Sequence, residues 1–119
     1  EQKAANRLTE AERKAAVKRA AQMLAEKTAH FAKEMGVTYG RITIREQKTR
    51  WGSCSSAGNL NYNWKLVLMP ERVMDYVVIH ELAHRKEMNH SARFYAVVAQ
   101  QMPDYKVWQS WLKEHGREY

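Results

Sequence analysis

The segment "MPERVMDYVVIHELAHRKEMNH" at residues 69–90 combines a helical apolar pattern with three of the chain's five histidines. Val73, Val77, His80 and His84 follow the i, i+4, i+7, i+11 spacing of a single helix face. We expect the helix to open at Pro70, because a missing N–H costs nothing in the first turn. His84 would lie about 40° around the helix from His80, so both imidazoles can reach one ion.

Glu81 follows the first of these histidines and would lie beside the ion, about 100° around the helix from His80. The spacing His-Glu-x-x-His is that of helical zinc sites whose glutamate is a general base. The apolar residues 77–79 predict burial, and buried imidazoles without a compensating cation are costly. The segment therefore predicts a Zn²⁺ site.

A third ligand is expected, and His90 is the preferred candidate. It lies six residues after His84, an interval used by zinc enzymes whose third histidine comes from just past the helix end. Those enzymes have glycine midway, where this chain has Glu87. We therefore expect the turn at residues 88–89, with the asparagine in the left-handed conformation.

Three other residues are alternatives to His90. Glu87 would still lie on the helix and would strain to reach the ion. Cys54 lies in a glycine- and serine-rich loop and is better interpreted as a small buried thiol. His115 lies on the apolar side of a final helix, where a core histidine is the better interpretation.

Three neutral imidazoles would leave the zinc ion an open position for water, whose pKa would fall towards about 7. Glu81 would accept the proton as this water attacks a carbonyl and would pass it to the leaving amine. The predicted reaction is metal-assisted hydrolysis. A structural zinc would normally have four protein ligands.

The rest of the chain predicts an α+β fold with a small antiparallel or mixed sheet packed on a long N-terminal helix. Thr9 and Glu12 form a capping box, and Gly36 ends this helix. Residues 37–45 and 60–69 resemble strands, and residues 50–59 a loop between them. Ser91 is expected to cap a helix after the histidines, and a last helix follows.

Length and composition indicate one domain spanning residues 1–119. At 119 residues the chain suits one core and is too short for two. No apolar run approaches the roughly 20 residues that a membrane span needs. The single Cys54 excludes an internal disulfide and favours the cytoplasm. Because the sequence starts at Glu1, we expect a fragment that lacks an N-terminal segment.

The net charge of +7 lies mostly in the first half of the chain. Arg13, Lys14, Lys18 and Arg19 lie on the predicted N-terminal helix. Such a basic helix can bind nucleic acid, although a solvated helix face is the alternative. Nothing here predicts the oligomeric state.

Two short segments, "RWGSCSS" at 50–56 and "HELAHRKEMNHS" at 80–91, are distinctive. With them, about residues 41–112 resemble the YgjP-like, SprT-related metallopeptidase domain. The resemblance implies a zincin-like fold, in which an active-site helix and C-terminal helices complete the predicted sheet and long helix. Members usually carry additional, often β-rich, residues ahead of the long helix, which this chain lacks.

The resemblance also implies roles for individual residues. The histidines matching His80, His84 and His90 bind zinc in that family, and the glutamate matching Glu81 is the catalytic base. Members are mostly described as peptidases or metal-dependent hydrolases, and some have been assigned nucleotide pyrophosphatase activity.

Three function classes follow. The first is a zinc-dependent metallopeptidase acting on polypeptide. The second is a metal-dependent nucleotide pyrophosphohydrolase, although such enzymes usually gather carboxylates around Mg²⁺, and only Glu81 and Glu87 lie near the histidines. The third is a non-catalytic zinc-stabilised binding module. The motif favours the first.

The substrate cleft is less clearly predicted. Trp51 would either line the cleft or plug the core below the zinc helix. Asn61 and Asn63 share one face of the second strand, which could bind extended peptide if it were the sheet edge above the site. The alternative for both is a polar solvent face. Three residues are undecided candidates for stabilising an oxyanion: Arg50, Tyr62 and Tyr105.

Overall fold

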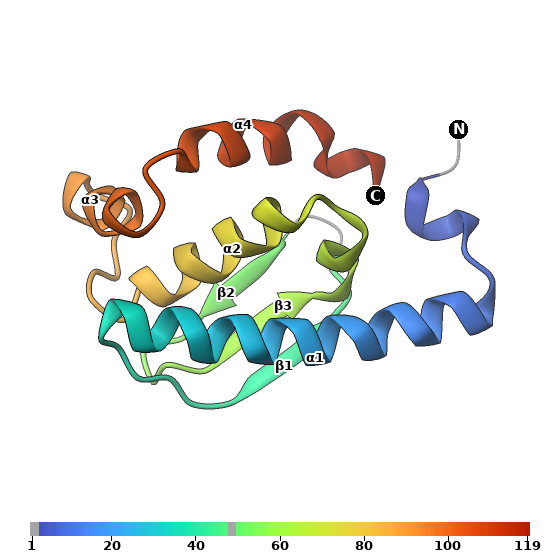
Figure 1. Ribbon diagram of the computed structural model, residues 1–119, viewed down its shortest axis with the longest axis horizontal. Helices are drawn as coiled ribbons and strands as arrows, with labels where there is room; N and C mark the ends of the chain where they lie inside the picture. The colour runs from blue at the N-terminus through green and yellow to red at the C-terminus, as the bar shows by residue number, and fades with distance from the viewer. Residues whose placement is uncertain (1–2, 48–49) are drawn as a thin grey trace.

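A computed structural model describes residues 3–47 and 50–119 and has the α+β architecture that the sequence predicts (Figure 1). Helices and a small mixed sheet form the fold, with α2 at its centre. The helices are η1 (Ala4–Arg7), α1 (Glu10–Met35), η2 (Trp64–Leu68), α2 (Glu71–Ala83), α3 (Ala92–Gln101), α4 (Tyr105–His115) and η3 (Gly116–Glu118). The strands are β1 (Ile42–Arg45), β2 (Gly52–Cys54) and β3 (Leu60–Asn63).

The long helix α1 begins and ends where the sequence predicts. The Thr9 side chain accepts a hydrogen bond from the N–H of Glu12, whose side chain accepts one from Thr9, so the capping box is complete. Gly36 ends the helix in the left-handed conformation at φ 71°. The buried face of α1 consists mainly of small residues (Ala16, Ala20, Leu24, Thr28, Ala32 and Met35). This face lets η2 and α2 pack closely against the helix.

The sheet is shorter than the apolar pattern suggests. Its strand order is β1-β3-β2, with β1 parallel and β2 antiparallel to β3. The expected second strand over 60–69 is wrong beyond Asn63, because the Asn63 side chain accepts a hydrogen bond from the N–H of Lys65 at 3.0 Å and starts η2. The expected loop over 50–59 contains β2, and the first strand occupies only the end of 37–45.

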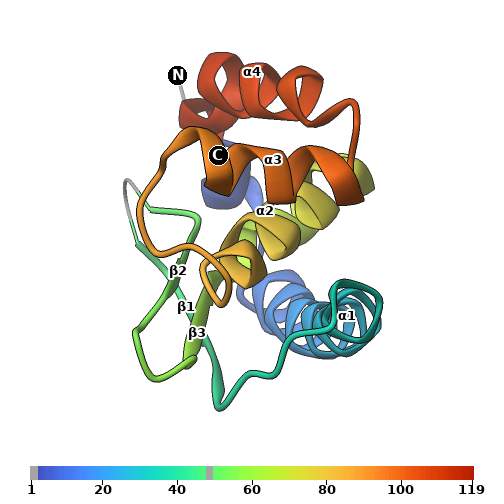
Figure 2. The same cartoon turned by 90° about the vertical axis from the view of Figure 1, so that its left-hand side faces the viewer.

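Helix α2 lies between the other layers (Figure 2). It contacts α1 on one side, α3 and α4 on another, and β2 of the sheet. Pro70 is the N-cap rather than the first helical residue, and the helix ends at Ala83 with His84 as the C-cap. The two histidines of the motif therefore straddle the end of a buried helix.

A partly buried ion-pair cluster joins α1 to α2. Nζ of Lys27 lies 2.6 Å from Oδ1 of Asp75 and 2.7 Å from Oε2 of Glu71. Arg72 also reaches Asp75, at 3.3 Å. These contacts hold α2 against the long helix at the end opposite the histidines. Within the part of the chain that is described, no helix is long and apolar enough to cross a membrane.

Candidate metal centre

Three imidazoles converge at the end of α2. Ligand atoms of His80, His84 and His90 all lie within 4.8 Å of one another, and among residues 3–47 and 50–119 no other group of histidine, cysteine or acidic residues does so. Nε2 of His80 lies 3.2 Å from Nε2 of His90. Tetrahedral zinc with Zn–N distances of about 2.0–2.1 Å requires ligand nitrogens roughly 3.3–3.4 Å apart. The separation of His80 and His90 is therefore close to that of two ligands of one tetrahedral ion.

Hydrogen bonds orient two of the rings. The hydroxyl of Tyr76 lies 3.3 Å from Nδ1 of His80, one helical turn away. Nδ1 of His84 lies 3.2 Å from the carbonyl oxygen of Glu87. Each contact engages Nδ1 and leaves Nε2 free to bind a cation, as in zinc sites whose ligand histidines donate their other N–H to a neighbour.

Phe94, at the start of α3, packs against all three rings. Its centroid lies 4.9 Å from that of His80, 4.5 Å from His84 and 4.9 Å from His90. The side chain of Ser91 accepts a hydrogen bond from the N–H of Phe94 and caps α3, as predicted. The apolar pattern identifies Phe94 as a core residue but gives no signal that it supports the histidines. Tyr76 could have been found from its i−4 spacing to His80.

The pKa values of His80 and His84 suit residues that bind a cation. Burial, and after it the charges of His84 and His90, lower the pKa of His80 to about 4. Burial also lowers the pKa of His84. These imidazoles are therefore neutral near pH 7 and keep the lone pair that metal binding requires.

Glu81 is buried beside the histidines, with 6% of its surface exposed. Burial raises the pKa of its carboxyl to about 7, and the charge of Arg50 opposes this rise. Glu81 borders a cavity of about 250 Å³ that is also lined by His80, His84, His90 and the strand β2. A carboxyl whose pKa is near neutrality in a cleft is typical of a proton-transfer group.

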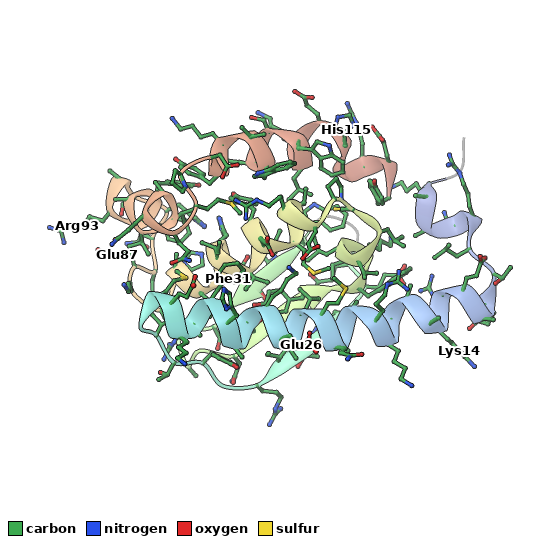
Figure 3. The ribbon with its side chains drawn as sticks, in the orientation of Figure 1. Lys14, Glu26, Phe31, Glu87, Arg93 and His115 are labelled. Atoms are coloured by element: carbon green, nitrogen blue, oxygen red, sulfur yellow. The ribbon has the colours of Figure 1, made fainter. Side chains whose placement is uncertain are left out.

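The alternatives to His90 lie outside the cluster. Cys54 lines the same cavity, but its sulfur does not join the group of mutually close ligand atoms. Glu87 lies beyond the helix end, so its expected place on the helix is wrong. His115 is not a core histidine: 40% of its side chain is exposed, and it pairs with Glu118 at 2.8 Å. Figure 3 shows Glu87 at the left of the molecule and His115 at the top, near the end of α4.

The loop between the second and third histidines turns without a left-handed residue. Among the described residues, no residue other than glycine has a positive φ. The expected left-handed conformation at 88–89 is therefore wrong. The chain instead turns through Arg85 and Lys86, whose N–H groups donate to the carbonyls of Leu82 and Ala83 at the helix end.

The sheet edge nearest the site is β2, not β3. Asn61 and Asn63 lie on the central strand, so the expectation that they form the peptide-binding edge is wrong. Asn61 instead bonds Arg45 and Ser53, while Asn63 is buried and caps η2. Antiparallel pairing of Ser53 with Asn61 turns the N–H and C=O groups of its neighbours Gly52 and Cys54 away from β3. Gly52 and Cys54 both line the cavity that Glu81 borders.

Trp51 lines a second cavity beside Glu81. Of the candidates for an oxyanion stabiliser, only Arg50 borders either cavity. The hydroxyl of Tyr62 lies 3.0 Å from Oγ1 of Thr28 in the core, and Tyr105 stacks on Tyr95. The structure therefore leaves Arg50 as the candidate at the cleft.

The four basic residues of α1 differ in their surroundings. Arg13 forms an ion pair with Glu46 and lies 5.0 Å from the centroid of the Trp64 ring. Lys14, Lys18 and Arg19 are exposed. Lys14 extends into solvent near the N-terminal end of α1 (Figure 3).

Comparisons with known proteins agree with this geometry. A family model described as "YgjP-like, metallopeptidase domain" matches residues 1–115. No curated protein sequence matches the chain significantly. Among solved structures, the metallopeptidase zymogen of Pyrococcus abyssi abylysin is 24% identical, with a TM-score of 0.69 over 79% of this chain and 96% of its own. The metallopeptidase zymogen of Methanocaldococcus jannaschii jannalysin is 19% identical, with a TM-score of 0.58 over 71% and 90%. These likenesses establish the zincin-like fold.

Proposed function

The chain belongs to the YgjP-like metallopeptidase family, and from this premise we propose that it is a zinc-dependent peptidase that cleaves extended polypeptide. We propose that His80, His84 and His90 bind one zinc ion and that Glu81 is the general base. Family membership supports a hydrolase that acts on polypeptide. The identity of the metal and the roles of individual residues are our inference.

The observation that carries this proposal is the pairing of the histidine cluster with a buried carboxyl. One ring nitrogen of each of the three histidines lies within 4.8 Å of the others, and Glu81 borders the same cavity. Three neutral nitrogen ligands suit Zn²⁺ better than Mg²⁺, which prefers oxygen. Bound there, zinc would act as a Lewis acid towards the peptide carbonyl and lower the pKa of water.

The residues of the chain supply the remaining steps. An oxygen of the Glu81 carboxylate accepts the proton of the attacking water, and the same carboxyl then delivers it to the leaving amine nitrogen. The outward N–H and C=O groups of Gly52 and Cys54 pair with the backbone of an extended substrate. Arg50 borders the cleft, where its guanidinium can stabilise negative charge that develops on the carbonyl oxygen.

The other two function classes have weaker support. A pyrophosphohydrolase would need several carboxylates around its metal, and Glu81 is the only one that borders the described cavities of the site. A structural zinc would normally have a fourth protein ligand. No such ligand joins the three histidines among the described residues. The single free Cys54 supports a reducing compartment such as the cytoplasm.

Metal analysis combined with two hydrolysis assays tests the proposal. We expect one zinc per chain by elemental analysis, hydrolysis of casein, and no release of pyrophosphate from nucleoside triphosphates. Glu81→Gln serves as the control for contaminating peptidases. Zinc-loaded protein that hydrolyses triphosphates but no polypeptide would replace this proposal with the pyrophosphohydrolase.

A further inference from the structure

The second cavity opens beside Glu81 and is not lined by His84 or His90. Its volume is about 210 Å³. Arg50, Gly52, His80 and Glu81 border both this cavity and the one at the histidine cluster. The two spaces therefore meet at the carboxyl that we propose as the general base.

Apolar and aromatic side chains form one part of the cavity wall, and Arg50, His80 and Glu81 form the rest. The apolar and aromatic side chains come from three parts of the chain: Trp51 precedes β2, Tyr76 and Val77 belong to α2, and Leu112 belongs to α4. The hydroxyl of Tyr76 lies 3.3 Å from Nδ1 of His80, and the residue is buried in the wall of the cavity. Trp51 and Leu112 are half-buried, so an occupant would remove part of their apolar surface from water.

The end of α4 is held against Trp51. An ideal β-carbon built on Gly116 would lie 3.1 Å from Cζ2 of Trp51, so the backbone and the indole are in close contact there. Trp51 and Leu112 border the cavity from segments that are distant in the sequence, so α4 supplies one side of it.

We propose that this cavity, the Trp51–Leu112 pocket, is a specificity pocket that takes one large apolar or aromatic side chain of the peptide substrate, next to the scissile bond. The inference rests on the proposed peptidase function. A cavity of about 210 Å³ is smaller than the roughly 300–1,000 Å³ typical of sites for whole small-molecule ligands. It suits a single side chain.

The geometry of strand addition leads to the same occupant. Alternate side chains of an extended peptide point to the same side. Suppose that the backbone of the peptide pairs with the outward groups of Gly52 and that its scissile carbonyl lies near Glu81. A side chain next to the scissile bond then lies at the Trp51–Leu112 pocket. Apolar walls discriminate between side chains by about 10- to 100-fold when a large group is lost.

Cleavage-site profiling tests the pocket. The zinc-loaded chain is given a peptide library with one varied position on each side of the bond, and products are mapped by mass spectrometry. We expect leucine, phenylalanine or methionine at one of the two adjacent positions to be favoured over glycine by at least about 10-fold. Leu112→Trp fills the pocket and removes this preference, whereas Leu112→Ala shifts it towards tryptophan.

Val107→Trp is the matched control, because Val107 lies on the same helix and is 57% exposed. This variant keeps the parental preference. Thermal melts establish that each variant folds. A parental enzyme without side-chain preference at either adjacent position overturns the proposal, as does a preference that Leu112→Trp and Leu112→Ala leave unchanged.

A binding measurement separates failure of the pocket from failure of the peptidase. Methyl signals of Val77 and Leu112 are followed by NMR while N-acetyl-phenylalanine amide or N-acetyl-glycine amide is added. The phenylalanine amide shifts both residues, the glycine amide shifts neither, and Leu112→Trp abolishes the shift at Val77. If no peptide is cleaved, the proposed function fails while the shifts still support the pocket. Methyl signals that the phenylalanine amide does not move overturn the pocket, whatever the activity.

Discussion

Gly52 of β2 lies directly against Glu81 of α2. An ideal β-carbon built on Gly52 would lie 3.0 Å from Cγ and 3.1 Å from Oε2 of Glu81. The same β-carbon would lie 3.1 Å from Cγ1 of Val77. The strand can approach the helix this closely only because residue 52 has no side chain, and this approach covers the carboxyl with backbone.

Gly52→Ala should therefore impair catalysis more than folding. The added methyl group displaces the Glu81 carboxyl by a few tenths of an ångström or more, and misplacement of a catalytic group by about 1 Å can lower the rate on the order of 100-fold. We expect kcat/KM for a peptide substrate to fall about 10- to 100-fold, with zinc content unchanged. Ser56→Ala, in the exposed loop after β2, is the control. Parental activity in Gly52→Ala would show that the carboxyl position tolerates the methyl group.

Glu81→Gln should retain the fold and the metal but lose hydrolysis. The amide has the shape of the carboxylate but cannot accept the proton of the attacking water. General-base groups contribute about 10²- to 10⁴-fold, and we expect kcat to fall by that factor. Glu87→Gln, which changes a carboxylate just beyond the helix end, should have little effect. Turnover near the parental rate in Glu81→Gln would remove Glu81 from the mechanism.

His90→Ala should weaken metal binding strongly. Removing a residue that merely hydrogen-bonds to a metal ligand lowers metal affinity about 10- to 100-fold. Removing the ligand itself should lower the affinity by at least about 100-fold. The measurement is competition for zinc with a chromogenic chelator. His30→Ala is the matched control, because His30 is exposed on α1 and 61% of its side chain is accessible. Equal zinc affinity in the two variants would return Cys54 and Glu87 to consideration as third ligand.

The sequence predicts the histidine helix well because its information is local. The positions of His80, Glu81 and His84 follow from helical periodicity, and the capping box at Thr9 marks the start of α1 by contacts within one turn. The strands are less predictable. Asn63 ends β3 through a hydrogen bond to Lys65, which an apolar pattern from 60 to 69 conceals.

The cleft depends on contacts between residues that are distant in the sequence. Strand β2 lies in a segment rich in glycine and serine, and its role as the site edge comes from pairing with β3 and contact with α2. The Trp51–Leu112 pocket depends on α4, whose position relative to Trp51 no local pattern specifies. The sequence therefore predicts the metal centre better than it predicts the substrate site.

Lys27→Met should destabilise the fold and change its response to alkali. Burial opposes the charge of Lys27, but its hydrogen bonds to Asp75 and Glu71 outweigh burial and raise its pKa above 10.5. A raised lysine pKa means that the contribution to stability is complete below pH 10.5 and is lost as pH rises through the folded-state value. We expect the parental protein to lose this contribution in strong alkali and the variant to lack that transition.

The size of the effect follows from burial of the pair. Removing one partner of a fully buried ion pair costs about 3–5 kcal/mol. Because this pair is only partly buried and Arg72 remains beside Asp75, we expect about 2 kcal/mol. Urea unfolding at pH 7 measures the loss. Lys33→Met, on an exposed position of the same helix, should change stability by less than about 0.5 kcal/mol. Equal stability of the two variants would contradict a structural role for the ion pair.

If the basic residues of α1 form an electrostatic footprint rather than a solvated helix face, the chain should bind nucleic acid without sequence preference. Arg13 is engaged by Glu46, so the expected footprint reduces to Lys14, Lys18 and Arg19. Each phosphate contact contributes about −0.9 to the slope of log affinity against log salt concentration, because binding releases a counterion. Replacing all three by glutamine should therefore flatten the slope by up to about 2.7. Fluorescence anisotropy with duplex DNA measures it, and Lys106→Gln on α4 is the control. Absence of binding at low salt, or a slope that the triple variant leaves unchanged, would identify the positive charge as a solvated helix face.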